Sequence, residues 1–249
     1  MSGNVFIDER VVLLDKWGIS CREVVFENYK DKILGCFVSV SDLNLVAEKL
    51  AESVIDFSWI SNLDKGTKRA YERTSKETAA ALVEIFKSTG INNGIINEEF
   101  GEVLVSIGAS QTLASLFEHI SLPIAELWKP QLKQNEGFDF HTVCKLNFIN
   151  YGEAKYSLSS NPHGKSLSQT KRFFHEEKHF RDRVHLISLV DEVAINNLDN
   201  DQYGAIIAFS INSENASKIF ENAIDLIEEK IEVDSLEKIY MVGVGVEYE

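Results

Sequence analysis

The residues of this chain best suited to chemistry lie in two short segments, residues 137–139 (Gly-Phe-Asp) and residues 153–155 (Glu-Ala-Lys). Side chains on a strand alternate between its two faces, so Glu153 and Lys155 would present a carboxylate and an ammonium on the same face. The midpoint between Asp139 and Glu153 falls within Lys-Leu-Asn at 145–147, which suits a tight turn. An antiparallel hairpin would then place Asp139 opposite Glu153. Two facing carboxylates repel unless a divalent cation lies between them, and such an oxygen-rich site suits Mg²⁺ or Mn²⁺.

The two segments resemble the halves of the PD-(D/E)xK nuclease motif, although the proline that often precedes the aspartate is absent. The resemblance implies hydrolysis of DNA phosphodiester bonds, with Asp139, Glu153 and the backbone carbonyl of Ala154 binding Mg²⁺. Lys155 would orient the attacking water or stabilise the charge of the transition state. On the tripeptide alone, Glu153 and Lys155 would instead indicate an exposed strand edge protected by charges.

Two flanking segments would add residues to this motif. Apolar residues recur with helical spacing between residues 100 and 117, which places Glu102 on a helix before the hairpin. In the superfamily a glutamate on the first helix often completes the metal site, and the resemblance assigns that role to Glu102; the alternative is a solvated helix face. After the hairpin, Gln169 and Phe173 resemble the Q-x-x-x-aromatic element of RecB-like nucleases, which assigns Gln169 to positioning the nucleophile or the backbone.

The expected elements follow the order helix, strand, hairpin, helix, strand. We expect the first strand at 122–128, a strand covered on both faces at 203–211, a helix from 215 to about 230 and a last strand at 238–247. This order matches the αβββαβ core of the superfamily. We therefore expect an α/β fold over residues 96–249, with a restriction-endonuclease-like core whose mixed central sheet is flanked by helices.

The region before the core is expected to be an α/β elaboration of residues 1–95 packed on that core. The pattern favours a strand at 32–40, a helix that begins after a cap at Ser41 or Asp42, and another helix at about 68–87. Residues 92–94 (Asn-Asn-Gly) are the best candidate boundary.

A narrower resemblance covers roughly residues 97–211. Gly-Glu at 101–102, Gly-Phe-Asp-Phe-His at 137–141, Tyr-Gly-Glu-Ala-Lys at 151–155 and the helix after Asn-Pro-His at 161–163 are similar to the HamA family, the effectors of bacterial Hachiman anti-phage systems. That resemblance implies a metal-dependent DNA nuclease held inactive by a helicase partner, HamB.

The distribution of charge favours a nucleic-acid partner although the net charge of the chain is −14. Residues 129–183, which contain the motif, hold ten Lys and Arg and six Asp and Glu, whereas the flanking regions are acidic. We predict phosphate contacts along a groove from this stretch; a locally positive solvated face is the alternative. The predicted contacts include Lys129, Lys133, Lys165, Lys171 and Arg172. The acidic remainder would discourage indiscriminate binding to nucleic acid and could serve a protein partner.

Composition argues against several other classes. The three cysteines are scattered with no C-x-x-C pair, which argues against a zinc cluster and fits a reduced cytosol. The N-terminus lacks a basic region followed by an apolar core, and no apolar run approaches membrane-spanning length, so we expect a soluble, cytoplasmic protein without a membrane partner.

Two rival interpretations remain. Residues 175–179 (His-Glu-Glu-Lys-His) fit the H-E-x-x-H pattern of zinc proteases, but the charged flanks indicate a solvated helix and no third ligand is evident. We interpret His175 and His179 as a polar helix face, and His141 as a packed histidine. The second rival is a catalytically silent module that keeps the nuclease-like fold and docks a partner through its acidic surface.

Overall fold

A computed structural model describes residues 5–29, 32–89, 96–129, 137–231 and 233–246. Within these ranges nine strands form one mixed sheet in the order β1-β3-β4-β9-β8-β7-β6-β5, and β2 pairs with β3. The strands are β1 (Val5–Ile7), β2 (Val12–Leu14), β3 (Ile19–Phe26), β4 (Ile33–Val40), β5 (Ile120–Ser121), β6 (Phe140–Val143), β7 (Ile149–Lys155), β8 (Tyr203–Ile211) and β9 (Ile239–Val246).

The centre of the sheet is parallel. Strands β7, β8, β9 and β4 run in the same direction, while β6 and β5 are antiparallel additions at one end and β3 at the other. Parallel strands covered on both faces are apolar along their whole length, which is the pattern of residues 203–211. The predicted strand at 203–211 is therefore confirmed, and the last predicted strand is found at 239–246.

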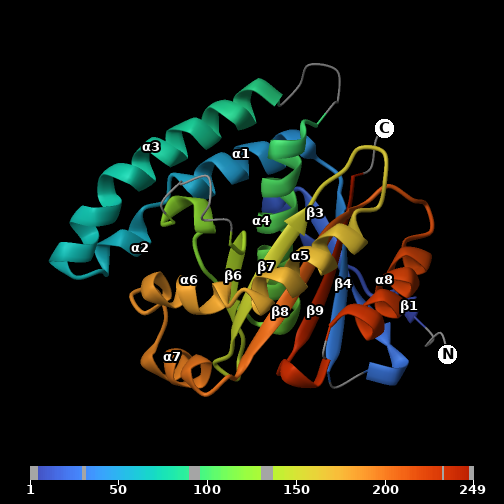
Figure 1. Ribbon diagram of the computed structural model, residues 1–249. Coiled ribbons are helices and arrows are strands. Elements are labelled where there is room, and N and C mark those ends of the chain that lie inside the picture. Colours follow the sequence, from blue (N-terminus) through green and yellow to red (C-terminus); the bar gives the residue numbers. More distant parts are fainter. Residues whose placement is uncertain (1–4, 30–31, 90–95, 130–136, 232, 247–249) are drawn as a thin grey trace.

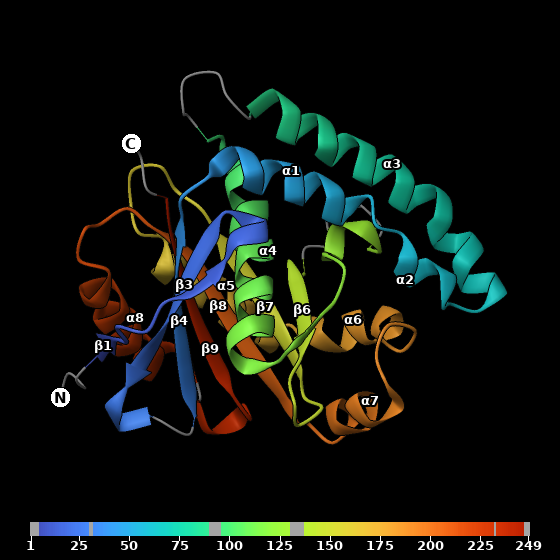
Figure 2. The ribbon, with the colours of Figure 1, turned by 180° about the vertical axis from the view of Figure 1, so that it is seen from behind.

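Helices cover both faces of the sheet, so the molecule is a three-layer α/β structure. Helix α4 packs on one face, with α1 and α3 packed outside it (Figure 2), and α5 and α8 pack on the other face (Figure 1). The helices are α1 (Leu43–Val54), α2 (Ser58–Ser61), α3 (Lys65–Thr89), α4 (Glu98–Phe117), α5 (His163–His175), α6 (Lys178–Leu186), α7 (Glu192–Asp199) and α8 (Ala216–Lys230). Short 3-10 helices are η1 (Asp15–Trp17), η2 (Glu27–Tyr29), η3 (Ala125–Leu127) and η4 (Val233–Ser235).

Helix α4 is the helix predicted from the apolar spacing between residues 100 and 117. The side chain of Asn97 caps it by accepting a hydrogen bond from the backbone N–H of Phe100 at 2.7 Å. The expectation that no apolar run approaches membrane-spanning length is wrong for this helix, which is long and apolar enough by those two criteria. Most of α4 is buried against the sheet, so its composition is that of a core helix.

The prediction of a strand at 122–128 is wrong. Strand β5 occupies only Ile120–Ser121, and the following segment turns into η3. Pro123 has no N–H to donate to a ladder, and the N–H of Ala125 donates instead to the carbonyl of Asp139 at 2.9 Å. This bond ties η3 to the start of the hairpin.

The N-terminal strands share the sheet that carries the motif. Strand β4 pairs parallel with β9 over its whole length, and Asp42 caps α1 by accepting from the N–H of Leu45. The predicted strand at 32–40 and both predicted helices are present, as β4, α1 and α3. Strands β1, β2 and β3 were not predicted. The predicted boundary at 92–94 lies outside the described residues.

Candidate active site

The hairpin that carries the two half-motifs has the predicted register. In β6 and β7, Phe140 is opposite Gly152 and His141 is opposite Tyr151, so continuing the ladder by one step brings Asp139 beside Glu153. The turn closes with a hydrogen bond from the N–H of Asn147 to the carbonyl of Cys144, and Asn147 has a φ of 59°. An asparagine tolerates this left-handed conformation better than most residues.

Asp139 lies just beyond the last paired residue of β6. Its N–H donates to the carbonyl of Gly152 at 2.8 Å, and its carboxylate accepts a hydrogen bond from the N–H of Ala154 at 2.8 Å. The N–H and C=O of one strand residue point to the same side of the strand. The carbonyl of Ala154 therefore faces the same edge of β7 as the Asp139 carboxylate.

The carboxylates of Glu153 and Glu102 both pair with the ammonium of Lys155. The Nζ of Lys155 lies 2.7 Å from Oε1 of Glu153 and 3.4 Å from Oε1 of Glu102, which projects from α4. The Glu153 side chain is 0% exposed, and its Oε2 has no hydrogen-bond partner among the described residues. A buried carboxylate oxygen without a donor is unfavourable, so this oxygen is suited to receive a cation.

A fourth carboxylate, Glu126, is not among the residues predicted from the sequence. It lies on η3, whose anchor to the carbonyl of Asp139 brings Glu126 into the electrostatic neighbourhood of Asp139 and Glu102. Burial, reinforced by the charge of Asp139, raises the pKa of Glu126 to about 7. The one sequence clue was a lone acid in the otherwise apolar stretch Ile-Ala-Glu-Leu-Trp at 124–128.

These four acids, Glu102, Glu126, Asp139 and Glu153, form the carboxylate cluster. Burial raises the pKa of Glu153, Asp139 and Glu102, and in Glu153 the nearby Asp139 charge adds to the effect. Burial opposes the charge of Lys155, but the carboxylates of Glu153 and Asp139 outweigh it and raise the pKa of this ammonium. With all four acids ionised, the cluster would carry more negative charge than Lys155 can balance, which is why their charged forms are disfavoured.

The residues of the cluster fit a hard divalent cation by their chemistry. They offer carboxylate oxygens and the Ala154 carbonyl, which are the donors that Mg²⁺ and Mn²⁺ prefer. Among the described residues, no three His, Cys, Asp or Glu side chains are arranged as a ready-made metal site. In this arrangement the Lys155 ammonium bridges Glu102 and Glu153, so the binding of an ion at Glu153 would require that bridge to shift.

Helix α5 contacts the strand that carries Glu153 through Ser166, whereas the role predicted for Gln169 stays a prediction. The hydroxyl of Ser166 donates to the backbone carbonyl of Glu153 at 3.0 Å and fixes β7 against α5. Gln169 is partly buried one turn further along, and within the described ranges no hydrogen bond joins it to the cluster.

The predicted phosphate contacts fall into three groups. Lys165, Lys171 and Arg172 are exposed on α5, whereas Lys133 lies outside the described residues. Lys129 does not fit the prediction, because its ammonium donates to Asp182 at 2.8 Å and to the carbonyl of Phe138 at 2.7 Å. Its side chain is only 13% exposed.

The H-E-x-x-H segment does not form one helix. Helix α5 ends at His175, Glu177 has a left-handed φ of 54°, and α6 begins at Lys178. The two histidines are therefore not one turn apart on a common face, as zinc binding by this motif requires. The prediction of a polar helix face is wrong for His179, which is buried against Phe180 and Tyr203.

The carboxylate cluster brings acidic oxygens together beside the amine of Lys155. The sheet and α4 fix these groups at the end of β7, and η3 adds one acid from the side. In comparisons with protein-family models, curated proteins and solved structures, nothing matches this chain.

Proposed function

We propose that this chain is a metal-dependent nuclease that hydrolyses DNA phosphodiester bonds with little sequence specificity. The observation that carries the proposal is the wholly buried Glu153, which has one oxygen on Lys155 and the other without a hydrogen-bond partner among the described residues. Proteins tolerate such a buried carboxylate where function needs it, because its charge is unfavourable until a cation compensates it.

The order of elements supports the proposal. Helix α4, strands β5 to β7, helix α5 and strand β8 occur in the αβββαβ order, with α6 and α7 between α5 and β8, and β8 is parallel to β7. In our interpretation Glu102, Asp139 and Glu153 are the acids of the PD-(D/E)xK motif and Lys155 is its lysine, whereas Glu126 is an addition to it. We therefore interpret this part of the sheet as a restriction-endonuclease-like core.

In the proposed mechanism, Asp139, Glu153 and the Ala154 carbonyl would hold Mg²⁺ or Mn²⁺, with Glu102 and Glu126 as further oxygen donors. When bound, the ion polarises the scissile phosphate and lowers the pKa of water, an effect worth several kcal/mol. Lys155 keeps its proton, because the surrounding carboxylates raise its pKa, and its positive charge stabilises the phosphate as negative charge develops.

The biological setting follows from the resemblance to the HamA family. We propose an anti-phage effector restrained by a HamB-like helicase. The net charge of −14 supports a protein partner more than extensive contact with DNA, because an acidic surface repels the phosphate backbone. The exposed bases of α5, Lys165, Lys171 and Arg172, would supply the phosphate contacts.

A catalytically silent docking module is the second candidate. The observation that favours it is the ion pairing of Lys155 with both Glu102 and Glu153, which already neutralises part of the cluster. Such a module would bind neither Mn²⁺ nor Mg²⁺ at the cluster and would leave DNA intact.

The deciding experiment is cleavage of single- and double-stranded DNA by the purified chain with Mg²⁺, with Mn²⁺ and with a chelator. Lys155→Met keeps most of the side-chain volume and removes the charge, and we expect it to lower the cleavage rate by at least ~10²-fold. Lys145→Met on the same hairpin is the matched control, because Lys145 is exposed and pairs only with the exposed Glu118 among the described residues. Equal cleavage by wild type and Lys155→Met with Mg²⁺ would refute the proposal, and the absence of both cleavage and Mn²⁺ binding in the wild type would favour the docking module.

A further inference from the structure

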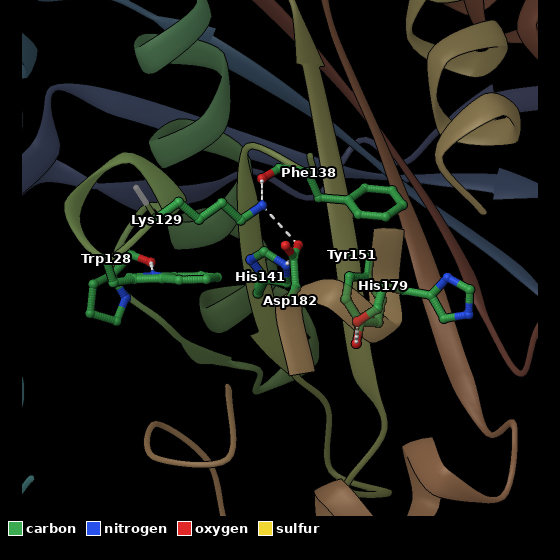
Figure 3. A network of polar contacts seen from close by, with 8 residues as sticks. Trp128, Lys129, Phe138, His141, Tyr151, His179 and Asp182 are labelled. Atoms are coloured by element: carbon green, nitrogen blue, oxygen red, sulfur yellow. Dashed lines mark hydrogen bonds and ion pairs between the residues drawn. The ribbon is translucent and has the colours of Figure 1, made fainter. Parts of the chain in front are cut away.

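A buried polar network that includes none of the four acids of the carboxylate cluster joins Lys129, His141 and Asp182 (Figure 3). Its centre is Asp182 on α6, which is 5% exposed. One oxygen of Asp182 lies 2.8 Å from the Nζ of Lys129 and 2.9 Å from the Nε2 of His141. The same Lys129 ammonium donates to the carbonyl of Phe138 at 2.7 Å.

The groups held by this network flank Asp139 along the chain. The Phe138 carbonyl belongs to the peptide bond immediately before Asp139, and His141 lies two residues after it. A Cβ at Gly137 would lie 2.8 Å from the Lys129 ammonium, so the absence of a side chain there lets the lysine reach its partners. The segment 137–141 is thus fixed from the side of α6 at two points, one on each side of Asp139.

The charges of the network hold it in place. Although burial acts against the charged form, the hydrogen bonds from His141 and Lys129 keep the pKa of Asp182 below its usual value. Removal of Asp182 would leave the largely buried Lys129 ammonium without its partner, close enough to Glu126 and Asp139 to affect their charges. The loss of the Lys129 contact to the Phe138 carbonyl and the uncompensated charge of Lys129 would each disturb Asp139.

We infer that Asp182 is a positioning residue for Asp139. It holds Lys129 on the Phe138 carbonyl and holds the ring of His141, and the Asp139 carboxylate is thereby set at the hydrogen-bonding distance from Ala154 that the metal site needs. The inference rests on the proposed function, because it concerns the residue proposed to bind the ion. Residues that support metal ligands from outside the coordination sphere typically change metal affinity 10- to 100-fold when they are replaced.

The test is a titration of the full chain with Mn²⁺, in which electron paramagnetic resonance measures the concentration of the free ion. We compare the wild type with Asp182→Asn, which keeps the shape and removes the charge, and with Gly137→Ala, which keeps all charges and displaces the Lys129 ammonium. Asp199→Asn is the matched control, because Asp199 is an exposed acid that pairs with Arg183 away from the cluster. Asp139→Asn shows which part of the binding depends on Asp139.

We expect Asp182→Asn and Gly137→Ala each to raise the Kd for Mn²⁺ by about 10-fold or more, and Asp199→Asn to leave it unchanged. A purely structural contribution of Asp182 would lower the Tm without changing the Kd, and wild-type Kd values in both folded variants would overturn the inference while leaving the proposed function intact. A wild type that binds no Mn²⁺, or binds it equally well as Asp139→Asn, would overturn both. If Asp182→Asn does not fold, the Kd of Gly137→Ala for Mn²⁺ alone tests the inference.

Discussion

Replacing Glu153 by glutamine should stabilise the protein in the absence of metal, although it removes a proposed catalytic residue. The Glu153 side chain is wholly buried, so alanine would leave a void, whereas glutamine keeps the volume and removes one negative charge. The new amide can accept from Lys155 and donate to a neighbouring carboxylate. The gain arises because four acids in the cluster repel one another and burial disfavours their charged forms.

The expected gain in stability depends on the ion pairs that Lys155 keeps after Glu153 is replaced. Replacing buried charged groups by neutral ones of similar volume stabilises proteins by roughly 1–4 kcal/mol. Lys155 keeps its ion pair with Glu102 at 3.4 Å, but it loses the closer one with Glu153 at 2.7 Å, which offsets part of the gain. We therefore expect about 1–2 kcal/mol, or a rise in Tm of roughly 2–8 °C for a chain of this size.

The assay is thermal and urea unfolding in a chelator and again in Mg²⁺. Mg²⁺ at about 100 times its Kd should stabilise the wild type by ~2.7 kcal/mol and have little effect on Glu153→Gln, so the order of stability of the two proteins should invert. Glu84→Gln is the control, since Glu84 is exposed on α3 and its replacement should change stability by no more than about 0.5 kcal/mol. A Tm for Glu153→Gln several degrees below that of the wild type in the chelator would show that Glu153 is well compensated, and the reasoning about the cluster would fail.

Two further predictions concern the groups that surround the site. Burial lowers the pKa of His179 from 6.5 to about 4, against the opposing charges of Asp201 and Asp182, so the unfolded chain takes up this proton first and stability falls as the pH drops from 6.5 towards 4. The full loss is roughly 3 kcal/mol, and urea unfolding of His179→Phe should show a correspondingly flatter pH profile than the wild type; equal profiles would contradict the assignment. Gly101→Ala would place a Cβ 2.2 Å from the ring of Tyr156, so we expect a loss of about 1–3 kcal/mol by chemical denaturation, and an unchanged midpoint would show that Tyr156 moves aside freely.

The parts of the fold that depend on local pattern were predictable from the sequence. The hairpin register followed from the turn at 145–147 and from the alternation of strand side chains, and the structure confirms it. Helix α4 followed from apolar periodicity, and β8 from an uninterrupted apolar run. In each case the signal lies within about twenty consecutive residues.

The predictions that failed depended on contacts between distant segments. Glu126 joins the cluster because η3 is anchored by the carbonyl of Asp139, and no pattern within residues 122–128 encodes that bond. The break between α5 and α6 places Glu177 in a left-handed conformation that glycine usually occupies. Burial of Lys178 and His179 accompanies this break, so tertiary packing outweighs a sequence that looks like continuous charged helix.

Several bases in residues 129–183 are paired or buried, so the count of charges in this stretch does not describe its surface. Of the bases in residues 129–183, Lys129 is held by Asp182, Lys155 by Glu153, and Lys178 is only 7% exposed beside Glu176. Lys129 and Lys155 compensate buried acids, and Lys178 is itself buried beside an exposed acid. None of the three is presented to a ligand, so the positive excess of this stretch overstates its attraction for nucleic acid. The exposed bases among the predicted contacts, Lys165, Lys171 and Arg172, all lie on α5. Any phosphate contacts proposed for this stretch therefore depend on α5, because Lys129 is already held by Asp182.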